Sequence, residues 1–102
     1  MTYDLLVIGS GPAGVTASIY AARANKSVLV IEKEAFGGLI THSPKIENYP
    51  GFPEGATGLG LMDLFHKQAK KFGVKFKLTD VKAVSLEGET KVVETFRTNY
   101  EC

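Results

Sequence analysis

The segment of residues 5–32, LLVIGSGPAGVTASIYAARANKSVLVIE, constrains the fold of this chain more than any other. Leu5–Ile8 is an unbroken apolar run, typical of a strand buried on both faces of a parallel sheet. Residues 13–24 predict a helix whose small side chains allow close packing on a sheet, and residues 28–31 predict a second buried strand. We therefore predict a strand–helix–strand unit and an α/β fold with a parallel sheet.

The turn between the first strand and the helix has the pattern Gly-x-Gly-x-x-Gly. Gly9 allows a tight turn, Gly11 lets a pyrophosphate approach the backbone, and Gly14 lets the helix pack close to the strand. Pro12 suits the first helical turn, because its missing N–H has no intrahelical partner there. The helix N-terminus directs free N–H groups and a partial positive charge at phosphates. The pattern therefore predicts a dinucleotide-binding turn.

The second strand is followed at once by Glu32. An acid roughly 20 residues after the glycine turn accepts hydrogen bonds from an adenosine ribose, and it favours a bare ribose over a 2′-phosphorylated one. Glycine-rich turns are common, and an ordinary turn with Glu32 on the surface is the alternative interpretation. Here the strand, the helix, the second strand and the acid supply the full context that the motif requires.

Composition limits the classes of function. The chain has 102 residues, 44% of them hydrophobic, and a formal charge of +1, which predicts one globular unit without strong attraction to nucleic acid or membranes. Leu5–Ile8 is far too short to span a bilayer and no basic leader precedes it, so we expect a cytoplasmic protein. Cys102 is the only cysteine, and His42 and His66 stand far apart in the sequence with no metal-binding pattern of carboxylates or thiols around them. We predict no metal site and no catalytic residue in this chain.

The middle of the chain contains a long segment rich in glycine and proline, residues 33–60. Loops of this length inside a compact unit usually bind something or are disordered, and this one carries too many apolar side chains for disorder. We interpret it as a loop that wraps a ligand. Residues 61–72 follow as an amphipathic helix, with His66 at its surface or boundary and Gly73 as its stop.

The last third of the chain has the alternation typical of strands. Residues 74–78 alternate strictly, so Val74, Phe76 and Leu78 are predicted to share a buried face. Residues 81–86 and 91–96 predict two strands joined by a hairpin turn, which adds an antiparallel meander to the parallel sheet. Residues 98–102 carry no closing helix or turn signal, and a doubly wound sheet usually has more strands, so residues 1–102 are expected to be part of a longer chain.

Taken together, these motifs resemble the N-terminal part of the FAD domain of the thioredoxin reductase family. The resemblance runs in order through IGSGPAG, AARAN, Gly37-Gly38 and IENYPGFP at residues 46–53. The glycine turn is common to many flavoproteins, whereas two glycines followed by ENYPGFP are more specific. The resemblance implies a Rossmann-like FAD-binding fold. It also implies, for the full-length parent, electron transfer from NADPH through FAD to a thioredoxin-type disulfide, and a homodimer.

The resemblance also implies roles for individual residues. The residues expected at the pyrophosphate are Gly9, Ser10, Gly11, Pro12 and Ala13, and Gly14 completes the cofactor-binding turn. Those expected at the adenosine end are Glu32, Lys33 and the backbone of Val81. Those expected at the flavin are Gly38, Leu39, Ile40, Thr41 and, at the polar edge of the ring, Asn48. Leu39 departs from the glutamine that the family commonly has, which is expected to alter ring contacts or flavin potential.

Several parts of the family pattern that follow the YEC strand do not occur in these 102 residues: the A-T-G turn after that strand, the pyridine-nucleotide domain with its C-x-x-C pair, and the C-terminal G-D motif. The chain alone is therefore predicted to lack reductase activity, and Cys102 is predicted to be structural or incidental. Two alternatives stay open. One is a flavoprotein like ferredoxin–NADP reductase, and the other is a non-catalytic FAD-binding or self-associating fragment.

Overall fold

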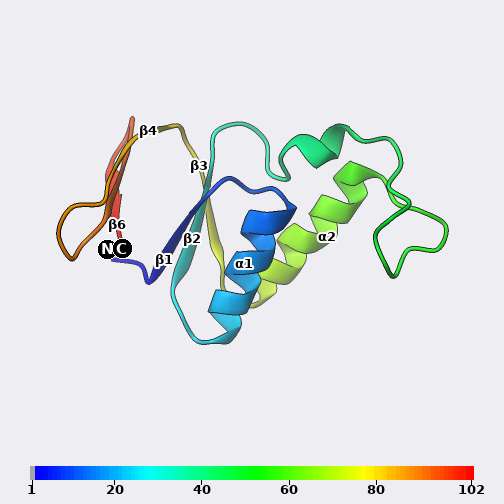
Figure 1. Cartoon of the computed structure of the whole chain (residues 1–102), viewed down its shortest axis with the longest axis horizontal. Coiled ribbons are helices and arrows are strands. Elements are labelled where there is room, and N and C mark those ends of the chain that lie inside the picture. The colour runs from blue at the N-terminus through cyan, green and yellow to red at the C-terminus, as the bar shows by residue number, and fades with distance from the viewer. Residues whose placement is uncertain (1) are drawn as a thin grey trace.

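The computed structural model describes residues 2–102, which form two three-stranded sheets and two α-helices (Figure 1). The elements in chain order are β1 (Leu5–Ile8), α1 (Pro12–Arg23), β2 (Val28–Glu32), the short 3₁₀ helix η1 (Leu39–His42), α2 (Gly58–Lys71), β3 (Lys75–Leu78), β4 (Val81–Ser85), β5 (Val92–Thr95) and β6 (Asn99–Glu101). The predicted strand–helix–strand unit and the mixed α/β class are confirmed.

The first sheet is parallel, in the order β1-β2-β3. Leu5 pairs with Val28, and Val30 pairs with Phe76. One face of this sheet packs against α1 and α2 through a cluster of buried side chains that includes Val15 and Met62. This strand order is that of one half of a Rossmann fold, and it places β2 at the centre of the sheet.

The close packing of α1 on the sheet depends on Gly14. A Cβ atom at this position would lie 2.5 Å from the backbone oxygen of Gly9 and 3.0 Å from Cγ1 of Val7. Real Cβ atoms do not approach backbone oxygens so closely, so only glycine fits without a shift of the helix. The role predicted for the third glycine of the turn, helix–strand packing, is therefore the one that the structure has.

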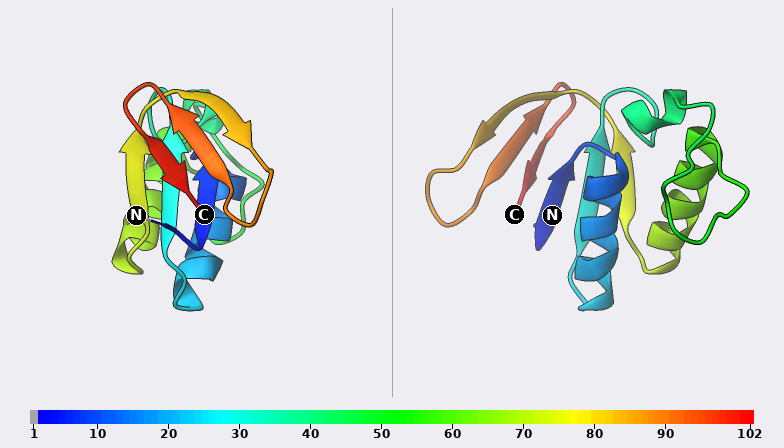
Figure 2. Two further views of the ribbon diagram at one scale, coloured as in Figure 1. Left: turned by 90° about the vertical axis from the view of Figure 1, so that its left-hand side faces the viewer. Right: turned by 45° about the vertical axis from the view of Figure 1, so that its right-hand side comes forward.

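The second sheet is the antiparallel meander β4-β5-β6, and it covers the other face of the parallel sheet. Val93 of β5 packs against Leu29 and Ile31 of β2, and all three side chains are at most 4% exposed. Figure 2 shows the meander on one side of β1 and β2 and the helices on the other. Because β2 is buried on both faces, its apolar residues do not alternate with polar ones.

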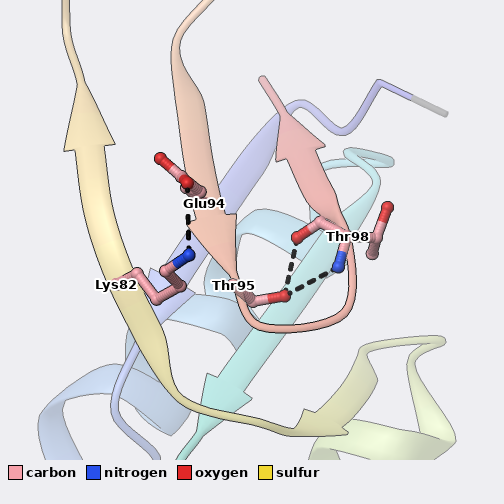
Figure 3. Close-up of polar contacts among 4 residues, drawn as sticks. All are labelled: Lys82, Glu94, Thr95 and Thr98. Carbon is pink, nitrogen blue, oxygen red and sulfur yellow. Dashed lines mark hydrogen bonds and ion pairs between the residues drawn. The ribbon is translucent and has the colours of Figure 1, made fainter.

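The turn between β5 and β6 is closed by a buried threonine (Figure 3). The Thr95 hydroxyl donates to the carbonyl oxygen of Thr98 at 2.6 Å and accepts from the Thr98 N–H at 3.2 Å. On the neighbouring pair of strands, Lys82 Nζ lies 3.6 Å from Glu94 Oε1. Residues 98–102 carried no signal for a turn or helix, and the structure makes Asn99–Glu101 the third strand of the meander.

Two further predictions differ from the structure. Helix α2 begins at Gly58, three residues before the predicted start, because the Thr57 hydroxyl caps it by accepting from the Gly60 N–H at 2.9 Å. Val74 is buried and Phe76 half-buried as predicted, but Leu78 is 55% exposed, since β3 is an edge strand and Leu78 is its last residue. Among residues 2–102, no helix has the length and apolar character needed to cross a membrane.

Candidate cofactor site

A cavity of about 280 Å³ lies at the carboxyl ends of the parallel strands. Its lining residues are Ile8, Gly9, Ile31, Glu32, Lys33, Thr79, Asp80 and Val81. Open α/β sheets bind ligands at this edge. The structure thus brings together four residues predicted from distant parts of the sequence to contact a cofactor, namely Gly9, Glu32, Lys33 and Val81.

The carboxylate of Glu32 is fixed by four hydrogen bonds. Its Oε1 accepts from the N–H of Ser10 at 3.0 Å and from the Ser10 hydroxyl at 2.9 Å. Its Oε2 accepts from the N–H groups of Lys33 at 2.9 Å and Glu34 at 3.2 Å. The side chain therefore lies across the turn between β1 and α1 and holds it to the end of β2.

These contacts determine the ionisation of Glu32. Burial acts to raise the pKa of the carboxyl group, but the hydrogen bonds from the Glu34, Ser10 and Lys33 amides and the Ser10 hydroxyl outweigh burial, so the pKa lies below its ordinary value of 4.5. Glu32 is therefore a carboxylate at neutral pH, the form that accepts hydrogen bonds from hydroxyl donors.

The long segment after β2 begins against the same turn. The Gly37 N–H donates to the Ser10 hydroxyl oxygen at 2.9 Å. A Cβ atom at Gly38 would lie 3.0 Å from Cα of Gly11, and the φ angles of Gly37 and Gly38 are +118° and +73°. The two adjacent glycines thus allow both the backbone conformation and the close approach to the first turn.

The first turn of α1 is open to an anion. Gly11 is the N-cap residue, and no side chain caps the free N–H groups of this helix end. A Cβ atom added at Gly9 or at Gly11 would meet nothing within 4 Å, so open space borders the turn. Pro12 is half-buried and Ala13 is exposed. These features fit a phosphate group, because they combine unpaired N–H donors, the helix dipole and unobstructed backbone.

The residues predicted at the flavin are less enclosed. Leu39 is 88% exposed, whereas Ile40 packs against the core cluster beneath α1 and α2. The Thr41 hydroxyl donates to the Gly38 carbonyl oxygen at 2.7 Å. Asn48 is exposed, its side chain makes no hydrogen bond within residues 2–102, and it lines a separate hollow of about 360 Å³ formed by Glu47 to Pro53. The structure groups residues 38–41 beside the turn and leaves Asn48 outside that group.

Sequence reasoning missed part of the site. Ile8 and Ile31 line the cavity because each stands at the carboxyl end of a parallel strand, a position that the strand pattern already marks. Thr79 reaches the site through the hydrogen bond from its N–H to the Glu32 carbonyl oxygen at 2.8 Å. The side-chain role of Ser10 had no signal in the sequence, because its partners stand 22 and 27 positions away.

The histidines lie outside this site. His66 stacks on Phe76 with ring centroids 4.2 Å apart, and burial followed by the nearby Lys70 lowers its pKa below 6.5, against the opposite effect of Asp63. Among residues 2–102, no three His, Cys, Asp or Glu side chains form a group able to hold a metal ion.

Residues 3–101 match the family model of the pyridine nucleotide-disulphide oxidoreductases. The chain belongs to this family. A thioredoxin reductase of Mycolicibacterium smegmatis is 52% identical over 91 residues, which cover 89% of this chain and 29% of that protein. The structure of thioredoxin reductase from Streptococcus pyogenes superposes with a TM-score of 0.93 at 42% identity, over 98% of this chain and 32% of that one.

A ferredoxin–flavin thioredoxin reductase from Clostridium acetobutylicum is also similar, with a TM-score of 0.83 and 34% identity over 98% of this chain and 34% of that one. The chain thus spans about a third of the length of these relatives. The predicted family, and the correspondence to the N-terminal part of the thioredoxin reductase FAD domain, are confirmed.

Proposed function

We propose that residues 2–102 bind FAD as part of an oxidoreductase like thioredoxin reductase. The observation that carries the proposal is the cavity at the carboxyl edge of β1 and β2, which is lined by Gly9, Glu32, Lys33 and Val81. Its volume of about 280 Å³ suits one end of a dinucleotide rather than the whole cofactor. The remainder of FAD would extend from this cavity past the N-terminus of α1.

The residues of the turn have distinct tasks in this proposal. The free N–H groups at the start of α1 bind the pyrophosphate, with Gly11 leaving room for it. Glu32 and Lys33 flank the adenosine, and the backbone of Val81 meets the adenine. Bound there, FAD supplies the electron-transfer chemistry, while the protein positions and tunes it.

The flavin end of the proposed site is the segment that begins at Gly38. The backbone of residues 38–41 approaches the ring, and the amide of Asn48 is free to pair with its polar edge. Leu39 brings an apolar side chain, 88% exposed, to the place where the family commonly has glutamine. We infer that ring contacts or flavin potential differ from those of relatives with glutamine.

For the whole protein, we propose that electrons pass from NADPH through FAD to a thioredoxin-type disulfide, in a cytoplasmic homodimer. Cys102 is the only cysteine among the 102 residues, so this chain has no dithiol pair to reduce a disulfide. The expected result is that the 102-residue chain shows no NADPH-dependent reduction of thioredoxin. Turnover by the pure chain would contradict this part of the proposal.

The direct test is the visible absorption spectrum of the purified chain, with mass spectrometry of whatever denaturation releases. The proposal predicts flavin absorption bands and released FAD, or their appearance after incubation with FAD and removal of the excess. A folded chain that stays colourless after incubation would contradict it. Far-ultraviolet circular dichroism on the same sample establishes that the chain is folded.

Ferredoxin is a second candidate for the electron donor, because a ferredoxin–flavin thioredoxin reductase is among the similar structures. Assays of the whole protein with NADPH and with reduced ferredoxin as separate donors distinguish the two, since the true donor should bleach the flavin absorption much faster than the other at equal concentration.

Self-association without catalysis is the third candidate. Several large apolar side chains are exposed, among them Leu39, Leu86 and Phe96 at 88%, 70% and 71%. Exposed apolar groups favour contacts between copies. Sedimentation distinguishes this candidate, because a clean monomer at micromolar concentration would count against it.

A further inference from the structure

Ser10 joins three segments that are distant in the sequence. Its side chain is 1% exposed, and its hydroxyl donates to Glu32 Oε1 at 2.9 Å while accepting from the Gly37 N–H at 2.9 Å. Its own N–H donates to the same carboxylate oxygen at 3.0 Å. One buried side chain thus connects the glycine turn, the end of β2 and the start of the long loop.

The chemistry of the hydroxyl suits this position. A hydroxyl supplies one donor and two acceptor sites, so it can bind a carboxylate and an amide at the same time. Both hydrogen bonds to Glu32 Oε1 come from Ser10, and both to Oε2 come from the backbone of Lys33 and Glu34. A carboxylate has about four acceptor sites, and the chain itself supplies four hydrogen bonds to this one. A ribose hydroxyl would therefore bind an oxygen that already accepts two hydrogen bonds from the chain. The orientation of Glu32 is therefore set within the chain.

We propose that Ser10 is a positioning residue for the cofactor, whose hydroxyl fixes the Glu32 carboxylate and the Gly37 backbone relative to the glycine turn. The inference rests on the proposed FAD-binding function and gives one residue of that site a specific task. Ser10 contributes to affinity by holding the adenosine end and the beginning of the flavin loop in their bound arrangement before the cofactor arrives. Its polar atoms contact Glu32 and Gly37, so it need not contact the cofactor itself.

Ser18 offers a matched control. It is also a buried serine, 0% exposed, but its hydroxyl donates to the Val15 carbonyl oxygen at 2.6 Å within α1. Both serines satisfy a buried hydroxyl, as buried polar groups generally must. Only Ser10 connects separate segments. Replacing each serine by alanine thus separates the effect of losing a buried hydroxyl from the effect of losing the connection.

The test compares FAD dissociation constants of the 102-residue chain, measured by quenching of flavin fluorescence, for the wild type, Ser10→Ala, Ser10→Cys and Ser18→Ala. Cysteine nearly conserves volume but is a weak donor and acceptor. Because a hydrogen bond to a charged group is involved, both Ser10 variants are expected to bind FAD about tenfold more weakly. Ser18→Ala is expected to keep an FAD dissociation constant within about twofold of the wild type, because the Ser18 hydroxyl bonds only within α1 and its loss leaves the site intact.

Two readouts identify positioning rather than a general loss of stability. In the cofactor-free chain, the Gly37 amide should exchange its hydrogen faster in Ser10→Ala than in Ser18→Ala, measured relative to amides of β2. A double-mutant cycle with Glu32→Gln should be non-additive, because the two side chains act through one contact. Equal FAD affinity of Ser10→Ala and wild type, or strictly additive effects in the cycle, would overturn the inference.

Failure of the underlying function has a different signature. If the folded wild-type chain binds no FAD, the proposed function fails before any variant is compared. If the wild type binds FAD, and both Ser10→Ala and Ser10→Cys bind it as tightly as the wild type does, only the proposed role of Ser10 fails. Should Ser10→Ala not fold, the FAD affinity of Ser10→Cys and the exchange rate of the Gly37 amide in Ser10→Cys, compared with Ser18→Ala, still decide the question.

Discussion

The two ends of the proposed cofactor site differ in how completely this chain builds them. At the glycine turn, Ser10 is 1% exposed and Glu32 accepts four hydrogen bonds from three residues. In the loop of residues 47–53, the side chains are mostly exposed, and the aromatic contacts of Tyr49 with Phe52 and Phe65 have ring centroids 6.0 and 5.7 Å apart. Figure 1 shows this loop extending beyond α2, at the end of the molecule away from the meander.

This difference indicates that the glycine turn and the loop of residues 47–53 contribute differently to cofactor binding. A site that is already ordered loses little conformational entropy when its ligand binds, so the turn should provide most of the affinity. The exposed loop and Leu39 are less fixed by contacts within the chain, so they can adjust to the flat flavin ring when it binds. We expect changes at the turn to alter stability and affinity, and changes at the loop to alter the flavin environment alone.

The largest expected effect is that of Gly14→Ala. The added Cβ would lie 2.5 Å from the Gly9 carbonyl oxygen, so α1 must shift away from β1. Overpacking of this kind costs about 1–3 kcal/mol, and the shift also displaces the N–H groups proposed to bind the pyrophosphate. We predict a lower denaturant midpoint and no measurable FAD binding.

Gly11→Ala is the matched control for that change. Its Cβ would meet nothing within 4 Å and its φ of −71° suits any residue, so the free energy of unfolding should change by about 0.5 kcal/mol or less. FAD affinity should nevertheless fall, because the methyl group occupies space left for the cofactor. Normal FAD affinity in Gly11→Ala would show that the pyrophosphate lies elsewhere.

Acid should loosen the turn through Glu32. Its pKa is lowered in the folded chain, so its stabilising effect is complete above the ordinary value of 4.5 and is lost as the pH falls through the lower folded value. Glu32→Gln should cost about 1–3 kcal/mol at pH 7, since hydrogen bonds to a charge are lost, and should flatten this acid limb. Urea unfolding at several pH values measures both effects.

The contribution of Asp4 to acid unfolding must be separated from that of Glu32 in the same titration. Its pKa is also lowered, chiefly by the hydrogen bond from the Ser27 N–H, so it contributes an acid limb of the same sign. Asp4→Asn should leave FAD affinity unchanged at neutral pH, because Asp4 stands at the opposite end of β1. An acid limb that disappears in Asp4→Asn and persists in Glu32→Gln would contradict the assignment to Glu32.

A smaller effect of pH on stability is expected at His66, which packs beside Phe36 of the long loop. Phe36 and His66 have ring centroids 5.1 Å apart, and the pKa of His66 is lowered chiefly by burial. The folded chain thus resists protonation of this histidine, so stability is constant above about pH 6.5 and decreases as the pH falls toward the lower folded value. His66→Phe should remove this limb, which is separate from the limb below pH 4.5. Thermal unfolding between pH 5 and 8 checks it.

The smallest effect on stability is expected at Leu39. Since its side chain is 88% exposed, Leu39→Gln should change the free energy of unfolding by less than about 0.5 kcal/mol. If the loop faces the flavin, the visible spectrum or reduction potential of the bound flavin should shift. An unchanged spectrum and potential in Leu39→Gln would remove residue 39 from the flavin site.

The sequence was sufficient for the elements with strong local patterns. The order β1-α1-β2, with the glycine turn between β1 and α1 and Glu32 at the end of β2, is correctly predicted because each element depends on a local pattern. What it could not provide were contacts made only after folding. Examples are the bonds of Ser10 with Glu32 and Gly37, and the capping of α2 by Thr57 three residues before its apolar periodicity begins.

Burial also depended on context that no local pattern contains. Leu78 alternates correctly with Val74 and Phe76, yet it is 55% exposed because β3 has no neighbour on one side within residues 2–102. Leu39, an apolar residue of the long loop that is expected at the flavin, is 88% exposed. Strand β6 was not predicted because three residues are too few to show a period of two, and its pairing with β5 forms only after folding.

The measurement that tests the central claim most directly is titration of the folded, cofactor-free chain with FAD, ADP and FMN. Isothermal calorimetry measures the affinity, and amide chemical shifts locate the binding. If the turn provides the affinity, FAD should bind, ADP should bind more weakly with shifts at Gly9, Gly11 and Lys33, and FMN should show no binding at the same concentrations. Binding of FMN with none of ADP would contradict the account, because it would place the affinity in the flavin loop rather than at the turn.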